Sequence, residues 1–216
     1  ERMNREFTFR VRNGRPWGIL KWAMSLDGRI GLPNGCSKWI TNSPARSLVH
    51  QIRSKCDAVI VGGGTVRVDD PLLTSRGKSN CEPLRVIFSR SLDLPKSAKL
   101  WDTKIAKTLI AYGPEGDETF FSDLPYGPEK LRLSSDNPSE LLSSLAKKGC
   151  NKILWECGPQ LATSAIKANC VQELIVFVAP KLIGGMPSMS PLNNFGFESI
   201  SSSYKLQHSF LDRKGE

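Results

Sequence analysis

Residues 42–64 read NSPARSLVHQIRSKCDAVIVGGG and place a helix directly before a strand. Ser43 is predicted to cap the helix and Pro44 to occupy its first turn. Apolar residues then recur at helical intervals, at Ala45, Leu48, Val49 and Ile52. The run DAVIVGG has the apolar, β-branched composition of a buried strand and ends in glycine. A helix followed by a buried strand is the repeating unit of a layered α/β fold.

The same alternation recurs along the chain. Five more apolar runs that close on Gly, Pro or Ser predict buried strands: WGILKWAMS (17–25), LRVIF (84–88), TLIAYG (108–113), KILWECG (152–158) and ELIVFVAP (173–180). Two further helices are predicted over 137–149, capped by Ser139 and stopped by Gly149, and over 158–170. This pattern predicts a twisted, mostly parallel sheet flanked by helices, with ligands at the carboxyl ends of the strands.

Two segments lack this patterning. Residues 113–136 are rich in Gly, Pro, Ser and acids, which predicts a surface loop around one short strand near KLRLS. Residues 184–203 are predicted to form a long loop before a final strand at 204–212. Because no internal repeat or low-complexity linker divides the chain, we expect a single domain over 1–216. Because the sequence starts on Glu1 and not on Met, we expect this domain to be excised from a longer chain.

Composition narrows the class of ligand. The net charge of +9 and the pI of about 9.4 suit a protein that binds acidic ligands. The basic residues are dispersed, without the dense Lys/Arg tract of a nucleic-acid surface, so small anionic ligands are favoured over nucleic acid. The sequence has no apolar run near 18 residues, which argues against a membrane span.

The six cysteines show no metal-binding or disulfide spacing. They stand at 36, 56, 81, 150, 157 and 170, without a Cys-x-x-Cys pair or a Cys/His cluster. We therefore expect reduced, mostly buried thiols, no bound metal and a reducing, intracellular compartment.

Two glycine-bearing strand exits are candidate ligand sites. They read VGGGTVRVDDP (61–71) and WECGPQLATS (155–164), and each offers small or hydroxyl residues after a buried strand. Such backbone lets N–H groups approach phosphate oxygens, and the second exit also opens a helix. Neither matches a known phosphate-loop motif, so plain turn formation remains the alternative for each.

Charged residues stand next to these exits. Arg53 and Arg76 each lie just outside a polar, Gly-containing strand exit, where a guanidinium suits a phosphate, although a solvated surface Arg is the alternative. Lys21 lies inside an apolar strand and needs either a partner or an edge position that reaches solvent. Glu156 is its acidic counterpart at the end of KILWE, whereas Asp27 is interpreted as a turn residue.

Several stretches together carry a family resemblance. KWAMSLDGRI (21–30), SKWIT (37–41), HQIRSKCDAVIVGGGTVRVDDPLLTSR (50–76), WECGPQL (155–161) and APKLIGG (179–185) occur in this order. They resemble the reductase domain of the bifunctional deaminase/reductases of riboflavin biosynthesis, most closely the plant form. The resemblance covers the chain from about Pro16 to Gly185. Two positions depart from it: Cys157 replaces a common Gly, and Ser89 replaces a common Asp.

The resemblance implies a fold, a reaction and a set of site residues. The fold would be similar to dihydrofolate reductase, and the reaction would reduce 5-amino-6-(5-phosphoribosylamino)uracil to its ribitylamino product with NADPH. Contacts to NADPH would come from Ala23, Trp39, Thr65, Asp69, Gly158, Pro159, Gln160, Leu161, Ala162, Thr163 and Ser164. Substrate contacts would come from Lys21, Ser37, Arg53, Leu73, Arg76 and Glu156, with Lys21 and Glu156 also catalytic.

Further expectations concern the cofactor phosphate, assembly and compartment. Arg90, between Ser89 and Ser91, is predicted to meet the 2′-phosphate of NADPH, with a surface Arg as the alternative. The apolar run 173–182 is predicted to form a homodimer contact, and the plant resemblance implies a plastid location. The alternative function is a noncatalytic nucleotide-binding module of the same fold. A pterin reductase is disfavoured because two phosphate-directed arginines have no role there.

Overall fold

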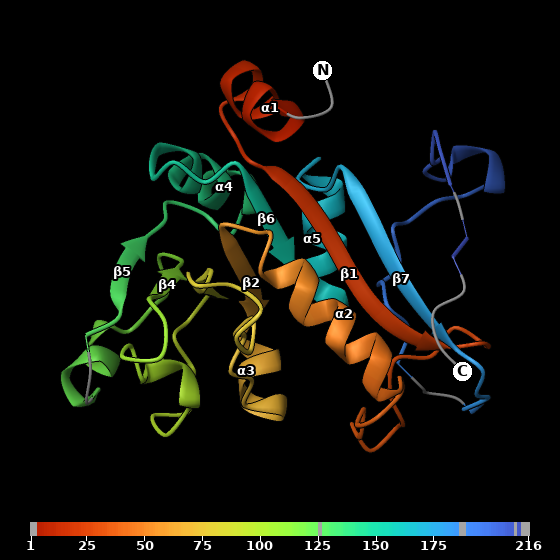
Figure 1. The fold of residues 1–216 in the computed structure, drawn as a ribbon, viewed down its shortest axis with the longest axis horizontal. Helices are drawn as coiled ribbons and strands as arrows, with labels where there is room; N and C mark the ends of the chain where they lie inside the picture. The colour runs from red at the N-terminus through yellow and green to blue at the C-terminus, as the bar shows by residue number, and fades with distance from the viewer. Residues whose placement is uncertain (1–3, 125–126, 186–188, 210, 213–216) are drawn as a thin grey trace.

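The computed structural model describes residues 4–124, 127–185, 189–209 and 211–212. Its centre is a seven-stranded sheet in the order β5-β4-β3-β2-β6-β1-β7, and all six strand pairings are parallel (Figure 1). The strands are β1 Trp17–Ser25, β2 Ala58–Gly62, β3 Leu84–Ser89, β4 Thr108–Tyr112, β5 Glu129–Arg132, β6 Lys152–Trp155 and β7 Glu173–Ala179. The predicted α/β fold with a parallel sheet is therefore confirmed, including the short strand near KLRLS.

The described residues form five α-helices beside the sheet: α1 Arg5–Asn13, α2 Ser43–Arg53, α3 Gly63–Asp69, α4 Pro138–Lys147 and α5 Pro159–Lys167. Short 3₁₀ turns occur at Lys99–Trp101 (η2), Glu118–Asp123 (η3) and Ile200–Ser202 (η4). No helix in the described part of the chain is both long and apolar enough to cross a membrane.

The helix caps differ from the predicted ones. The side chain of Asn42 accepts a hydrogen bond from the Ala45 amide at 3.1 Å, and Asn137 accepts one from the Ser139 amide at 3.0 Å. The predictions of Ser43 and Ser139 as caps were thus wrong. Each asparagine precedes the first helical turn in extended backbone, with proline in that turn, and so meets the free N–H groups first. Gly149 lies just past α4 in the left-handed region, with φ of 90°, as its role as a stop requires.

Three further elements were predicted incorrectly. Helix α1 was missed, and the glycine-bearing stretch after β2, interpreted as a turn, winds into α3. The final strand predicted at 204–212 is wrong for the residues described there, 204–209 and 211–212, which are exposed and form no strand. A strand needs a neighbour to complete its hydrogen bonds, and the described sheet ends at β7.

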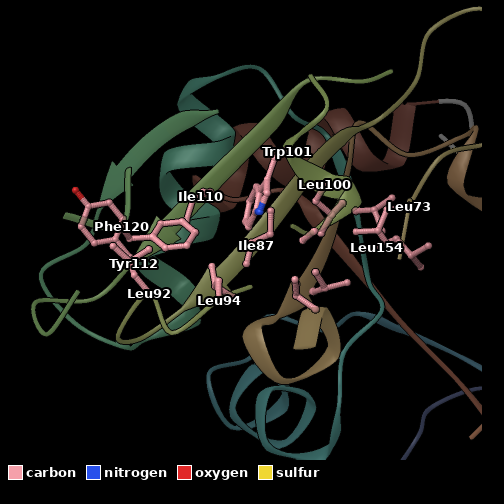
Figure 2. Packing of buried hydrophobic residues seen from close by; sticks show 14 of the residues in the cluster. Leu73, Ile87, Leu92, Leu94, Leu100, Trp101, Ile110, Tyr112, Phe120 and Leu154 are labelled. Atoms are coloured by element: carbon pink, nitrogen blue, oxygen red, sulfur yellow. The ribbon is translucent and has the colours of Figure 1, made fainter. Parts of the chain in front are cut away.

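The core lies on both faces of the sheet because side chains alternate along each strand. On one face Ile60 of β2 packs with Leu141 of α4 and Ala162 of α5. On the other face Val61 of β2 packs with Val66 of α3 and with the residues drawn in Figure 2, among them Ile87, Leu100, Trp101 and Ile110. Both faces of the central strands are covered, as a parallel sheet requires.

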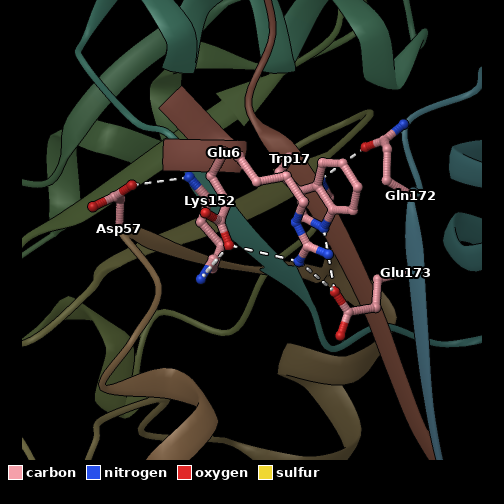
Figure 3. A network of polar contacts seen from close by, with 8 residues as sticks. Glu6, Trp17, Asp57, Lys152, Gln172 and Glu173 are labelled. Carbon is pink, nitrogen blue, oxygen red and sulfur yellow. Dashed lines mark hydrogen bonds and ion pairs between the residues drawn. The ribbon is translucent and has the colours of Figure 1, made fainter. Parts of the chain in front are cut away.

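Polar contacts fix α1 to the amino ends of the strands (Figure 3). Lys152 Nζ, at the start of β6, lies 2.7 Å from a carboxylate oxygen of Glu6. Arg5 Nη2 lies 3.2 Å from Glu173 Oε2 at the start of β7, and its guanidinium stacks 4.2 Å from the Trp17 ring. Helix α1 thus lies at the starts of β1, β6 and β7, away from the carboxyl ends of the strands.

Candidate active site

A cleft of about 1240 Å³ opens where the strands end. Its walls come from the last part of β1, the glycines after β2, the Ser-Arg-Ser after β3 and the segment after β6. The inner face of α2 and the loop 69–76 close it on the other side. This is the edge at which parallel α/β sheets bind ligands.

Glu156 lies at the centre of this cleft between two cations. Leu20 of β1 pairs with Trp155 of β6, so the next residues, Lys21 and Glu156, meet at the sheet edge. Lys21 Nζ lies 3.6 Å from Glu156 Oε2. Arg53, the last residue of α2, donates from Nε to Oε1 at 2.6 Å and from Nη2 to Oε2 at 3.0 Å. Of the two alternatives for Lys21, a partner or an edge position that reaches solvent, the structure shows the partner, Glu156.

These ion pairs set the charge state of the site. Burial alone would raise the pKa of Glu156, but Arg53 first and Lys21 second outweigh it and lower this pKa to about 2. Burial likewise opposes the charge on Arg53, and Glu156 overcomes it and raises the pKa of the guanidinium. Glu156 is thus a carboxylate at neutral pH and cannot serve there as a proton donor.

The second arginine is held differently. Arg76 is exposed and lines the cleft from a loop in which Leu73 and Arg76 both have left-handed backbone, with φ of 55° and 51°. Glu82 anchors this loop, accepting from the Ser75 amide at 2.5 Å and from its hydroxyl at 2.9 Å. Within the described residues Arg76 makes no hydrogen bond or ion pair, whereas Arg53 also donates to the Thr74 carbonyl at 3.1 Å. Arg76 therefore has donors available for a ligand.

The opposite half of the cleft has room for a dinucleotide. A Cβ built on Gly64 or Gly158 would meet no atom within 4 Å, although both glycines line the cleft, so a ligand can approach their backbone closely. Helix α5 begins at this wall with Gly158 as its cap, and no side chain caps it. Its first amides are thus available to an anion, which fits the phosphates of a nicotinamide cofactor.

A hydrogen bond and several ion pairs border this half of the cleft. Lys38 Nζ lies 3.2 Å from the Asp69 carbonyl, and Lys99 Nζ lies 2.8 Å from Asp70 Oδ2. Arg90 is exposed, with Nε 3.4 Å from a carboxylate oxygen of Glu115 and 3.9 Å from one of Asp136. Arg90 therefore reaches the cleft, but two carboxylates compete for its charge.

Residues 26–41 form the mouth of the cleft and are tied to the segment after β7. Asp27 lies in the turn after β1, as predicted, but it accepts from the distant amides of Ile183 and Gly184 at 3.1 and 2.7 Å. Lys181 Nζ donates to the Trp39 carbonyl at 2.9 Å. Arg46 stacks on the Trp39 ring at 4.6 Å, so the ring is held exposed at the cleft entrance.

The structure brings nearly all the predicted site residues to this one cleft. Lys21, Ala23, Ser37, Trp39, Arg53, Thr65, Asp69, Leu73, Arg76, Arg90, Glu156, Gly158, Pro159, Gln160, Leu161 and Ser164 line it. Ala162 and Thr163 do not line it: both are buried on the inner side of α5, and Thr163 accepts from the Asn193 amide at 2.8 Å. The contacts of all these residues to ligands stay predictions.

Sequence reasoning missed several other lining residues. Among them are Lys38, Arg46, His50 and Lys99. The signal for His50 was present, because it lies one helical turn before Arg53 on the same side of α2. The position of Lys38 depends on loop conformation and that of Lys99 on the short 3₁₀ turn η2, for neither of which the sequence holds a periodic signal.

The cysteines and acidic residues suggest no separate chemistry. All six cysteines are free: Cys56, Cys150 and Cys170 are buried, Cys157 is half-buried, and Cys36 and Cys81 are exposed. Burial and the neighbouring Glu156 raise the pKa of the Cys157 thiol, so this lining residue is a poor nucleophile. Across the described ranges no group of three or more His, Cys, Asp and Glu side chains could hold a metal ion.

Comparison with known proteins identifies the family. Residues 16–212 match the family model described as the RibD C-terminal domain. The chain belongs to this family. It is 44% identical over 207 residues to the riboflavin biosynthesis protein RibD of Synechocystis, covering 95% of this chain and 56% of that protein.

Two further relatives of this RibD-type domain come from a plant and from a bacterium of known structure. It is 38% identical over 192 residues to the chloroplastic riboflavin biosynthesis protein PYRR of Arabidopsis thaliana, covering 88% of this chain and 32% of that protein. The solved Thermotoga maritima diaminohydroxyphosphoribosylaminopyrimidine deaminase/5-amino-6-(5-phosphoribosylamino)uracil reductase superposes with a TM-score of 0.78 at 27% identity, covering 97% of this chain and 58% of that one. The chain thus spans about half the length of its bacterial relatives and a third of the plant one.

Proposed function

We propose that this RibD-type domain reduces the ribosyl group of 5-amino-6-(5-phosphoribosylamino)uracil to the ribitylamino product, with NADPH as the reductant. The observation that carries the proposal is the single cleft that joins two unlike halves. One half presents the glycine backbone and the start of α5, which suit a dinucleotide. The other presents Lys21, Glu156, Arg53 and Arg76, which suit a phosphorylated, polar substrate.

The residues of the substrate half would act mainly by orientation. The ribosylamine ring must open to an imine, whose anomeric carbon then accepts a hydride, and NADPH supplies that hydride when bound. Transfer requires the two reacting carbons to be held about 3 to 3.5 Å apart with water excluded. Arg76 and Ser37 would hold the substrate phosphate, and Arg53 would complete that end of the cleft while it fixes Glu156.

The ion pairs also bear on the proton that the imine nitrogen needs. Because Glu156 is held as a carboxylate, Lys21 is the proton donor of the pair. Glu156 would then orient the Lys21 ammonium and hold hydroxyl groups of the opened sugar. The role of Glu156 is thus to accept hydrogen bonds, while Lys21 gives the proton.

Oxidation of NADPH in the presence of freshly deaminated substrate tests this function. We expect the absorbance of NADPH to fall only when both the phosphoribosylamino compound and the protein are present. One molecule of the ribitylamino product should form for each NADPH consumed. If the domain were instead a noncatalytic nucleotide-binding module, it would bind the cofactor without turning over the substrate. A pterin that replaced the natural substrate with equal efficiency would also count against the proposal.

The choice of NADPH over NADH gives a first specific prediction. Arg90 is proposed to meet the 2′-phosphate, and its two carboxylate neighbours reduce the effect of removing it. Arg90→Ala is expected to lower the ratio of kcat/KM for NADPH to that for NADH by about fivefold, as for an exposed ion pair. An unchanged ratio, measured by initial rates with each cofactor, would show that Arg90 does not bind the 2′-phosphate.

Assembly gives a second prediction. Strand β7 is at the edge of the sheet and exposes Val176 and Val178, with Leu182 exposed just beyond it. We propose that two copies pair through this edge as an isologous homodimer. Light scattering at micromolar concentration should give the mass of a dimer for the wild type and of a monomer for Val178→Lys. A wild type that is monomeric at every concentration tested would rule the dimer out.

We also propose a plastid location for the full-length protein, because the similar Arabidopsis relative is described as chloroplastic. Import of the full-length precursor into isolated chloroplasts tests it. Retention of the protein outside the organelle would overturn it.

A further inference from the structure

One side of α2 forms a wall of the cleft. Ser43, Arg46, Ser47, His50 and Arg53 all line it, at the three- and four-residue spacing that places side chains on one face of a helix. His50 therefore lies between the arginine that stacks on Trp39 and the one that binds Glu156. It is the only titratable group of this stripe whose charge changes near neutral pH.

The His50 ring makes no hydrogen bond of ordinary geometry within the described residues, and the Thr74 carbonyl is its close polar neighbour. Its Nδ1 atom is buried and unpaired, and among the described residues neither ring nitrogen makes a well-formed hydrogen bond. The other two cations of this stripe of α2 are engaged: Arg53 binds Glu156 and Thr74, and Arg46 donates to the Thr41 carbonyl at 2.7 Å. This half-buried ring lines the cleft and has only a weak contact with the Thr74 carbonyl, so it is available to a ligand there.

Three charged side chains act on the His50 ring: Arg53 of α2, Arg76 of the facing loop and Glu156 after β6. Burial, then Arg53 of α2 and Arg76 of the facing loop, lower the pKa of His50, while the Thr74 carbonyl and Glu156 act in the opposite direction. The ring is therefore neutral in the free protein at pH 7. A phosphate dianion placed among His50, Arg53 and Arg76 would reverse this balance, because a nearby negative charge favours the protonated ring.

We propose that His50 is a further ligand of the substrate phosphate and takes up one proton from solvent as that phosphate binds. The inference rests on the proposed function, since it needs a phosphorylated substrate in this half of the cleft. His50 would then be the third cation of the phosphate site, beside Arg53 and Arg76, and would be charged only while the phosphate is bound. The free cleft avoids an additional buried positive charge, and the charge forms only when a dianion is present to stabilise it.

Calorimetry with the phosphorylated ribitylamino product tests the proton uptake. Binding heats would be measured at pH 7.5 in buffers of different ionisation enthalpy, where a phosphate monoester is mainly a dianion. The wild type is expected to take up about half a proton more per site than His50→Gln, because Gln keeps polar atoms but cannot become charged. Gln51→Ala, on the exposed side of the same helix, is the matched control and should behave as the wild type.

Kinetics separate a ligand from a merely structural residue. His50→Gln is expected to raise KM for the phosphorylated substrate about three- to tenfold with little change in kcat, and to flatten the pH dependence of KM. His50→Arg, which carries a permanent charge, should restore KM without proton uptake. For the dephosphorylated product the wild type and His50→Gln should bind equally.

The possible failures are distinguishable. A wild type that neither binds the phosphorylated product nor turns over the substrate would sink the proposed function, and this inference with it. A wild type that does both, but takes up the same number of protons as His50→Gln, would overturn only the role of His50. Equal effects of His50→Gln on the phosphorylated and dephosphorylated compounds would likewise make His50 a structural residue.

Discussion

Glu156→Gln is expected to lower the free energy of unfolding by about 3 kcal/mol, the lower end for breaking a buried ion pair. The change leaves the guanidinium of Arg53 and the ammonium of Lys21 in the cleft wall without their common carboxylate. Both cations are largely buried, with only 13% and 16% of their side chains exposed, so water compensates little. Urea unfolding at pH 7 measures the difference, and Glu198→Gln, an exposed glutamate, serves as the control.

The loss should depend on pH with a defined sign. The pKa of Glu156 is lowered to about 2 in the folded protein, below its ordinary value of about 4.3 in an unfolded chain. Its stabilisation is therefore present in full above the ordinary value and is lost as the pH falls through about 2. The difference in the free energy of unfolding between the wild type and Glu156→Gln should therefore shrink as the pH falls from about 4.3 to about 2. Equal stability of the two proteins at pH 7 would contradict the central role given to the carboxylate.

Arg76→Ala is expected to raise KM for the phosphorylated substrate about ten- to a hundredfold, the loss of a charge-assisted contact worth about 1.5 to 3 kcal/mol. Arg76 has no partner among the described residues, so its removal should leave stability and NADPH affinity nearly unchanged. Arg53→Ala should combine a similar rise in KM with a loss of stability, because Arg53 also holds Glu156.

Two controls accompany the arginine variants. The dephosphorylated substrate already lacks the contact, so the wild type and Arg76→Ala should use it equally poorly. Arg12→Ala changes an exposed arginine of α1, at the far end of the sheet, and should have no effect. If Arg76→Ala weakened NADPH binding and left the phosphorylated substrate untouched, Arg76 would belong to the cofactor half.

The sequence predicted the parts of the fold that depend on local pattern. The run WGILKWAMS became β1 at its predicted bounds, because an apolar run closed by a polar residue is a local signal. Helix α1 was missed, since its sequence REFTFRVRN is mostly polar and its stability comes from distant partners, such as Glu6 with Lys152. The cap at Asn42 was misassigned by one residue, because Asn and Ser both stand before the proline and only the backbone conformation separates them.

The candidate site was predicted as a list of residues, but not as an arrangement. That Lys21 and Glu156 meet follows from the placement of β6 beside β1, which no local pattern specifies. The hydrogen bonds from Arg53 to Glu156 likewise became visible only in three dimensions. They separate the two arginines: Arg53 is held by Glu156, whereas Arg76 is available to bind a ligand. His50 stood in the quoted sequence, yet its unpaired ring nitrogen is a property of the packed structure.

The central claim is that one cleft holds a nicotinamide cofactor and the opened phosphoribosylamine together, so that a hydride passes directly between them. Mass spectrometry of the product made with each of the two C4-deuterated forms of NADPH tests it most directly. The account predicts that one form, and not the other, gives a ribitylamino product one mass unit heavier, with the deuterium on the former anomeric carbon. Product without label from either form, or label taken from deuterated water at that carbon, would contradict it.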